Sequence, residues 1–107
     1  MRTTTIGVAS LGEQIRTLRE QAKLSLREVA GEIGIDTSLL GKIERNERQP
    51  TKDQIKQMSY FFKINEKALM KEFLSDQFAY KMIEEEVDID TLRVSEAKVS
   101  FYKKSKR

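Results

Sequence analysis

The sequence predicts an all-α fold, and three observations support this. Apolar residues recur at intervals of three and four along most of the chain, as they do on one face of a helix. Three segments have a serine or threonine followed three residues later by Glu or Gln, the pattern of a helix capping box. These are Ser10 with Glu13, Ser25 with Glu28 and Thr51 with Gln54. The 107 residues contain only one proline, Pro50.

The capping signals and the apolar spacing together place five helices. We expect them at residues 11–22, 26–33, 37–45, 52–62 and from residue 66 onward. Asp36 and Asn65 are short polar residues that can cap the third and fifth of these helices. The connections are about two to six residues long, as in compact helical domains.

Each helix has an apolar face of its own. The first helix has Leu11, Ile15, Leu18 and Ala22 on this face. The fourth has Ile55, Met58 and Phe62, and Tyr60 and Phe61 widen its face. The fifth has Leu69, Met70, Phe73 and Leu74. The fifth helix can continue through Phe78 to Met82 and Ile83 at the same spacing.

The second and third helices are expected to pack at a steep angle. Leu26, Val29, Ala30 and Ile33 have the spacing of one helical face, and Gly34 stands where a left-handed residue would end the helix. The third helix has only a narrow apolar edge, Leu40 and Ile43, and is otherwise polar or small. A helix with a thin inward edge and a short hydrogen-bonding outward face suits the major groove of DNA.

The chain after Ile83 gives a weaker signal. Residues 87–90 are expected to form an irregular link, with Asp90 or Thr91 capping a last helix over residues 92–102. Val94, Ala97 and Phe101 would then line one face of that helix. Ala97, Val99 and Phe101 also alternate as in a strand, but we favour the helix.

The charge is mildly basic and unevenly distributed. The net charge is +3 and the isoelectric point about 9.2, which by itself indicates nucleic acid only weakly. Residues 84–90 are acidic, and the chain end is basic through Lys98, Lys103, Lys104, Lys106 and Arg107. These segments are either two solvated faces or complementary surfaces on two copies of the chain.

The composition argues against several classes of function. There is no cysteine and no histidine, so we expect no disulfide, no metal site, no cofactor and no catalytic residues. Asp88 and Asp90 lack the remaining ligands of a calcium loop. No apolar run could span a membrane and residues 1–6 lack a signal-peptide pattern, which favours a cytoplasmic protein. No ligand pocket is evident from the sequence, so we expect no small-molecule ligand.

The span from about Leu11 to Met70 resembles the Cro/C1-type helix-turn-helix domain of bacterial and phage regulators, the Xre family. The matching residues, in the family's order and spacing, are Leu11-Gly12, Ile15, Leu18-Arg19, Leu24-Ser25, Val29-Ala30, Ile33-Gly34-Ile35, Ile43-Glu44-Arg45 and Pro50. The resemblance implies a five-helix, lambda-repressor-like DNA-binding domain over residues 8–74. Residues 75–107 are then a C-terminal extension.

The resemblance implies that residues 37–45 form the recognition helix. Thr37, Ser38, Leu39 and Lys42 would contact base edges. Lys42 can donate to guanine, and the hydroxyls can donate or accept. Leu39 could meet a thymine methyl or belong to the core. Gly41 could allow close approach of the DNA or simply tolerate helix packing.

The resemblance also implies phosphate contacts and one structural ion pair. The phosphate contacts would be Ser25, Arg27, Arg45, Asn46, Arg48 and Lys52. Arg19 and Glu44 would form a partly buried ion pair. Leu26 departs from the family's usual glutamine, so one anchor is either lost or replaced by Arg27. Asn46 replaces the usual glycine, but asparagine tolerates the left-handed conformation.

One recognition helix covers too little DNA for selective binding, so the resemblance implies a homodimer on double-stranded DNA. The extension adds apolar residues that either cap the domain's own core or pair with a second copy, and we favour pairing. The dimerisation residues would be Phe78, Met82, Ile83, Leu92 and Phe101. We expect a repressor acting on a palindromic operator. A restriction–modification controller, a phage repressor and an antitoxin all remain open, as does a protein-interaction module with weak or no DNA binding.

Overall fold

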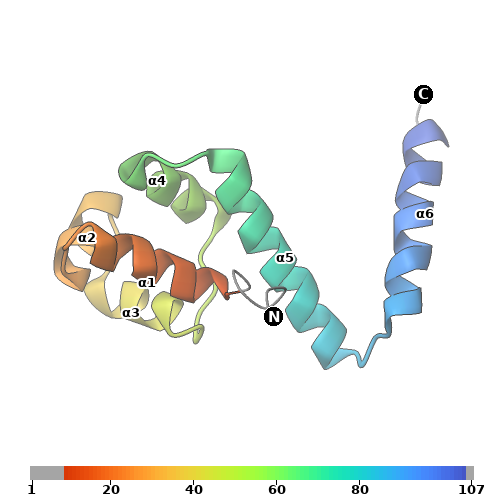
Figure 1. Ribbon diagram of the computed structural model, residues 1–107, viewed down its shortest axis with the longest axis horizontal. Coiled ribbons are helices and arrows are strands. Elements are labelled where there is room, and N and C mark those ends of the chain that lie inside the picture. The colour runs from red at the N-terminus through yellow and green to blue at the C-terminus, as the bar shows by residue number, and fades with distance from the viewer. Residues whose placement is uncertain (1–8, 106–107) are drawn as a thin grey trace, which may run out of the picture. The chain divides into compact units, whose positions relative to one another are not determined.

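The computed structural model describes residues 9–105, and within them it contains six helices and no strand (Figure 1). The helices are α1 (Leu11–Gln21), α2 (Leu26–Ile33), α3 (Thr37–Glu44), α4 (Lys52–Phe62), α5 (Glu66–Glu84) and α6 (Ile89–Ser105). The chain divides into two compact units after Asp76, so that α5 begins in the first unit and ends in the second. The all-α prediction is confirmed.

All three predicted capping boxes are present. The hydroxyls of Ser10, Ser25 and Thr51 accept the backbone N–H groups three residues later, at 3.2, 3.0 and 3.1 Å. Asn65 also caps α5 as predicted, because its Oδ1 accepts the N–H of Ala68 at 2.9 Å. These bonds satisfy N–H groups that a helix start otherwise leaves unpaired.

Glycine is required at two places that set the packing of the first unit. Gly34 ends α2 with φ of 76°, the left-handed conformation predicted for it. Gly12 lies against the end of α3, where an added Cβ would collide with the carbonyl oxygens of Ile43 and Glu44. The absence of a side chain at Gly12 therefore lets α1 approach α3 closely.

The core of the first unit lies between α1, α2, α3, α4 and the first half of α5. Its buried apolar residues are Leu11, Ile15, Val29, Ala30, Ile33, Leu40, Ile43, Ile55, Met58, Leu69 and Phe73. Partly buried side chains close its margin, among them Leu26, Leu39 and Phe61. This core determines which face of α3 points outward.

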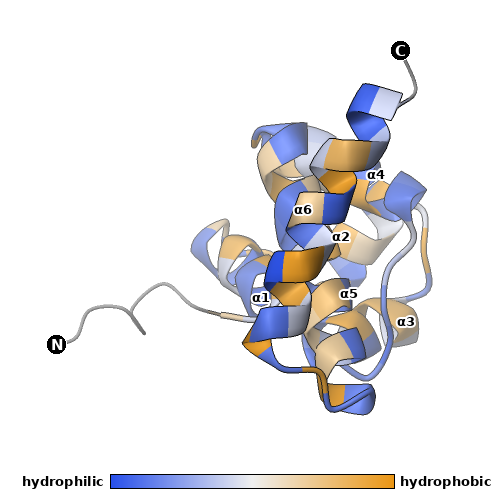
Figure 2. Ribbon diagram, turned by 90° about the vertical axis from the view of Figure 1, so that its right-hand side faces the viewer, coloured by the Kyte–Doolittle hydropathy of each residue, from blue (hydrophilic) through white to orange (hydrophobic). Residues whose placement is uncertain are grey.

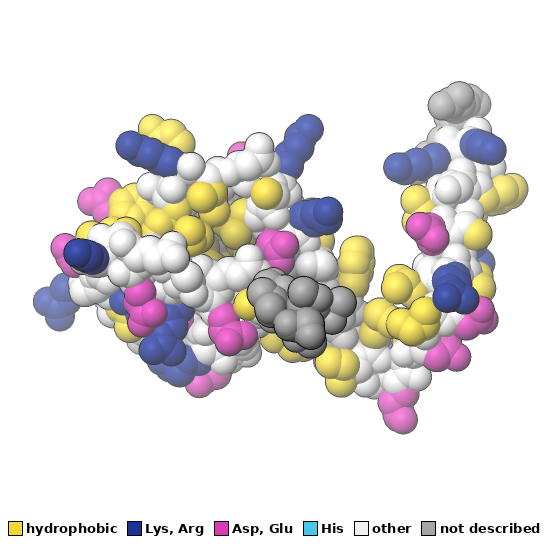
Figure 3. Space-filling model, in the orientation of Figure 1, with side chains coloured by type: hydrophobic (Ala, Val, Ile, Leu, Met, Phe, Trp, Pro, Cys, Tyr) yellow, Lys and Arg dark blue, Asp and Glu magenta, His cyan; other side chains and the backbone are white. Residues whose placement is uncertain are grey.

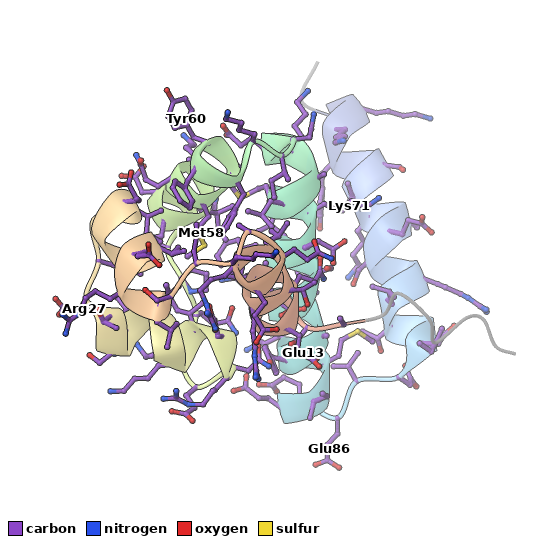
Figure 4. The ribbon with its side chains drawn as sticks, turned by 60° about the vertical axis from the view of Figure 1, so that its left-hand side comes forward. Glu13, Arg27, Met58, Tyr60, Lys71 and Glu86 are labelled. Atoms are coloured by element: carbon purple, nitrogen blue, oxygen red, sulfur yellow. The ribbon has the colours of Figure 1, made fainter. Side chains whose placement is uncertain are left out.

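Several expectations for the first unit are wrong in detail. Ala22 is an exposed residue just after α1 and contributes nothing to the core. Tyr60 is 85% exposed, because a residue five positions after Ile55 on a helix points to a different side (Figure 4). Asp36 precedes α3 as expected, but its side chain makes no capping bond.

The second unit contains the end of α5 and all of α6. No side chain within residues 77–105 is buried, and Figure 2 shows hydrophobic and hydrophilic residues interspersed along α6. The expected irregular link is correct for Val87 and Asp88 but wrong for Ile89 and Asp90, which belong to α6. The caps expected at Asp90 or Thr91 are also wrong. Asp88 is the cap, since its Oδ1 accepts the N–H of Thr91 at 2.9 Å, and α6 starts at Ile89.

The strand alternative for Ala97, Val99 and Phe101 is also wrong, because all three residues lie within α6. The helix is continuous to Ser105 and longer than predicted. None of the helices within residues 9–105 combines the length and the apolar character that crossing a membrane requires.

Candidate nucleic-acid interface

The recognition helix predicted from the sequence is α3, and the core holds it by one edge. Leu40 and Ile43 are almost fully buried. Thr37, Ser38 and Lys42 are exposed. Because a helix turns about 100° per residue, Ser38 and Lys42 lie on the side opposite the buried edge, and Thr37 lies at the margin between the two. The short polar residues thus lie on an outward face that is free to meet a ligand.

Leu39 and Gly41 lie at the borders of this face. Leu39 is partly buried and packs against the core. Gly41 is buried beneath neighbouring side chains, and a Cβ at this position would lie 3.1 Å from Nη1 of Arg45 and 3.9 Å from Cδ1 of Leu26. Of the two interpretations offered for Gly41, packing is the one that this geometry favours.

Arg45 extends over Gly41 and is held by Glu47. Its Nε donates to Oε2 of Glu47 at 2.9 Å, and both side chains are more than half exposed. The hydrogen bond to Glu47 raises the pKa of Arg45, and the bond from Arg45 lowers the pKa of the Glu47 carboxyl. Glu47 was not identified from the sequence. It adds a negative charge at the end of the outward face.

Arg19 and Glu44 form the ion pair that the resemblance implies. Nε and Nη2 of Arg19 donate to Oε2 and Oε1 of Glu44 at 2.7 and 3.0 Å, a two-pronged contact between α1 and α3. Nη1 of Arg19 donates to the carbonyl of Leu24 at 3.0 Å. The hydrogen bond to Glu44 raises the pKa of Arg19. Because the Glu44 side chain is only 5% exposed, the pair fixes α3 against α1 from within.

Asn46 turns its side chain towards the start of α1. Its φ is 63°, as expected for a residue that replaces glycine in a left-handed turn. Its Nδ2 donates to the hydroxyl of Ser10 at 2.8 Å. The amide predicted to contact phosphate is therefore engaged within the protein. No sequence pattern signals this bond, since Ser10 and Asn46 are far apart in the chain.

The remaining predicted phosphate contacts are all on the surface. Ser25, Arg27, Arg48 and Lys52 are exposed, and Arg27 points away from α2 in Figure 4. The backbone N–H of Ser25 is already engaged in the capping box, because it donates to Oε1 of Glu28 at 2.8 Å. This bond lowers the pKa of Glu28 and leaves a carboxylate at the start of α2.

Basic side chains gather near α3. Figure 3 shows several Lys and Arg side chains at the lower left, where α3 lies in Figure 1, with acidic side chains beside them. The electrostatic surface is thus mixed rather than uniformly positive. Within residues 9–105, no group of three or more acidic side chains is placed to hold a metal ion.

An open groove of about 460 Å³ lies between α1 and the start of α5. Its walls include Leu18, Ile64 and Leu69, and at its rim Nε2 of Gln14 donates to Glu72 at 2.8 Å. The sequence did not indicate this groove, because its walls come from segments about 50 residues apart along the chain.

The family model described as "Helix-turn-helix domain" matches residues 12–72, more than half of the chain. The chain belongs to the helix-turn-helix domain family. The match begins in α1 and ends in α5, so it contains the whole of α2 and α3. Comparison with curated proteins finds no match.

Solved structures with the same fold agree with this assignment. The restriction-modification controller protein C.AhdI from Aeromonas hydrophila is 29% identical, covering 55% of this chain and 89% of its own, with a TM-score of 0.52. The master regulator for biofilm formation SinR, in complex with DNA, is 28% identical, covering 56% and 97%, with the same TM-score. This helix-turn-helix chain is thus a DNA-binding transcriptional regulator of the Cro/C1 type.

The SinR protein/SinI protein complex is similar over a longer span. It matches 88% of this chain and 98% of its own, with a TM-score of 0.53 and 21% identity. The matched part of this chain is longer than the first unit, so the likeness of fold extends into the residues after Asp76. At this identity it concerns the fold alone.

Proposed function

We propose that this helix-turn-helix regulator is a homodimeric repressor that reads a palindromic operator with α3. The observation that carries the proposal is the division of α3 into a buried edge, Leu40 and Ile43, and an exposed polar face, Thr37, Ser38 and Lys42. A helix anchored by one edge can enter the major groove without disturbing the core behind it.

Base contacts are assigned to Thr37, Ser38 and Lys42, with Leu39 at the edge of the face. Thr37 and Ser38 are in the first turn of α3, the end that helix-turn-helix proteins direct towards the bases. Lys42 follows Ser38 by one turn and can donate to O6 or N7 of guanine. Leu39 can offer only its exposed part to a thymine methyl, because the rest packs against the core.

Phosphate contacts are assigned to Ser25, Arg27, Arg45, Arg48 and Lys52, all of them exposed. Such contacts fix the orientation of the protein and make affinity sensitive to salt. For Asn46, whose side chain bonds to Ser10, a phosphate contact would require that bond to exchange. The ion pair of Arg19 with Glu44 supports the site by fixing α3 rather than by touching DNA.

We assign residues 8–74 to DNA binding and residues 75–107 to pairing. The dimerisation residues proposed are Phe78, Met82, Ile83, Leu92 and Phe101, most of which are strongly exposed in the single chain. Exposed apolar side chains in this number are typical of a surface that another molecule covers. Two copies could then occupy two half-sites about one helical turn apart and exclude other proteins from a promoter.

The proposed setting is the cytoplasm of a bacterium, where such a repressor meets its operator. SinR was solved in complex with DNA, and C.AhdI is a restriction-modification controller. The regulatory roles of these two similar proteins support the proposal.

A gel-shift titration of genomic fragments at two salt concentrations tests the proposal. Binding should weaken steeply as salt rises, roughly in proportion to the number of phosphates neutralised. Lys42→Ala should reduce discrimination between sequences, whereas Lys71→Ala, an exposed lysine on α5, serves as the matched control. Binding whose affinity does not change with salt, or equal discrimination between sequences by the two variants, would exclude α3 as the recognition helix.

A protein-interaction module is the second candidate, and Leu26 is the observation that favours it. Leu26 is partly buried where the family usually has a phosphate-binding glutamine. The carboxylate of Glu28 lies at the same helix start. A module of this kind would keep the fold and show no salt-dependent DNA binding in the same titration.

A further inference from the structure

Helix α6 (Ile89–Ser105) has apolar side chains on two opposite sides. With about 100° of rotation per residue, Leu92 and Phe101 point roughly 180° apart. Ile89 and Val99 lie on the Leu92 side, and Val94 and Ala97 on the Phe101 side. A single seam between two helices cannot contain both Leu92 and Phe101, so the dimerisation residues proposed above belong to two surfaces of α6.

The side that contains Phe101 forms a narrow line, here named the Ala97 stripe. It consists of Asp90, Val94, Ala97, Phe101 and Lys104, whose spacings alternate between four and three residues. This alternation keeps all five within an arc of roughly 80° and is the pattern of a helix-pairing seam. None of the five is buried, with Val94 46% and Phe101 64% exposed.

The Ala97 stripe is complementary to itself when read backwards. If a second α6 runs antiparallel and Ala97 faces its own copy, Asp90 faces Lys104 and Val94 faces Phe101. The charges at the ends then attract, and the apolar residues meet in the middle. A parallel pair would instead put Asp90 against Asp90 and Lys104 against Lys104, which costs free energy.

We propose that α6 pairs antiparallel with α6 of a second copy through the Ala97 stripe, with the two-fold axis at Ala97. The inference rests on the proposed homodimer and specifies its geometry. The two-fold relation makes one patch serve both partners, as an isologous interface requires. The small side chain of Ala97 lets the two helices approach closely at the axis.

The charged ends set direction and register more than affinity, because exposed ion pairs contribute little. Lys98 lies at the margin of the stripe and near its own copy across the axis. Its long side chain can reach solvent. Lys98→Gln, which removes this like-charge approach, should therefore tighten the dimer slightly.

Single-cysteine cross-linking tests the arrangement in the full-length protein, since the chain has no cysteine of its own. Under mild oxidation, Ala97→Cys should form a disulfide-linked dimer. Val94→Cys should not, because it faces Phe101 rather than itself. Ser95→Cys, whose native hydroxyl donates to the carbonyl of Thr91 on the other side of the helix, is the matched control.

Charge exchange tests direction independently. Asp90→Lys and Lys104→Asp should each raise the dimer dissociation constant about tenfold in sedimentation equilibrium, because each places like charges at both ends. The double variant should return within about threefold of the wild type. A parallel dimer would show no such recovery and would cross-link through Val94→Cys.

The outcomes separate this inference from the proposed homodimer. A wild type that is dimeric while Ala97→Cys does not cross-link would overturn the antiparallel stripe and leave the homodimer standing. A wild type that stays monomeric at all concentrations and on DNA would overturn both. Equal cross-linking at positions 95 and 97 would also contradict the stripe, because it would reflect random collision.

Discussion

Phe73 and Phe101 are the same residue type on two helices, and the structure treats them in opposite ways. Phe73 on α5 is 2% exposed and belongs to the core of the first unit, whereas Phe101 on α6 is 64% exposed. The same contrast holds for the two units as wholes, since no side chain within residues 77–105 is buried. The first unit completes its own core, and the second presents apolar surface that a partner can cover.

The same contrast appears among charged residues three positions apart. Glu44 and Glu47 each pair with an arginine, but the Glu44 side chain is 5% exposed and that of Glu47 is 55% exposed. Glu44 lies between helices, where its partner is essential. Glu47 lies in solvent beside the outward face of α3, so its pair with Arg45 should contribute little to the stability of the fold.

The largest expected effect comes from replacing each of the two phenylalanines by alanine. Phe73→Ala should lower the free energy of unfolding by about 3–5 kcal/mol, because it leaves a cavity in the core. Phe101→Ala should change it by less than about 0.5 kcal/mol in dilute protein. Urea denaturation followed by circular dichroism measures both. Similar losses in the two variants would mean that α6 packs within its own chain.

The next effect concerns the two glutamates. Glu44→Gln should destabilise the first unit by about 3 kcal/mol, because Arg19 would keep a poorly solvated charge without its partner. Glu47→Gln should cost less than about 0.5 kcal/mol. The same denaturation experiment applies. Equal costs would show that burial of Glu44 does not decide the strength of its pair.

Much of the fold could be predicted because its signals are local. Ser25 and Glu28 are three residues apart, and Gly34 is the residue that must end α2, so neighbouring sequence suffices to place them. The prediction for Tyr60 is wrong because its apolar ring favours the core, whereas its position on α4 points it away from the buried face. The sequence does not single out Asp88, because Asp88, Asp90 and Thr91 lie within four positions and all three can cap a helix.

The site was less accessible to prediction, because its details depend on contacts between distant segments. The resemblance implied the Arg19–Glu44 pair, but the bond from Asn46 to Ser10 joins positions 36 residues apart and has no sequence signal. Glu47 stands next to basic residues in the sequence, but the sequence does not indicate which of them it contacts. Its bond to Arg45 needs coordinates to be seen.

A smaller effect sharpens the role of Glu47 at the outward face. Glu47→Gln should bind operator DNA about three- to tenfold more tightly at low salt, because it frees Arg45 and removes a negative charge. Fluorescence anisotropy titrations measure the change. Glu66→Gln, an exposed carboxylate at the start of α5, is the control and should have little effect. Weaker binding by Glu47→Gln would indicate that Glu47 positions Arg45 for the DNA.

The smallest effect concerns pH. The N–H of Ser25 holds the pKa of Glu28 below its ordinary value, so the bond stabilises the fold above the unfolded pKa near 4.5. That stabilisation is lost as the pH falls through the lower, folded pKa. In a plot of unfolding free energy against pH, Glu28→Gln should reduce the loss of stability at acid pH. A glutamine can replace the glutamate without titrating, as Gln54 does in the capping box of Thr51. An unchanged curve would mean that Glu28 does not contribute.

The most direct test of the central claim is the affinity of the wild type and of Lys42→Ala for an operator selected from genomic fragments and for its single base-pair variants. If the outward face of α3 reads bases, Lys42→Ala should abolish discrimination, by about 1–3 kcal/mol, at one base pair in each half-site and leave the other positions unchanged. A loss that is equal at every position, or no loss at all, would contradict the account.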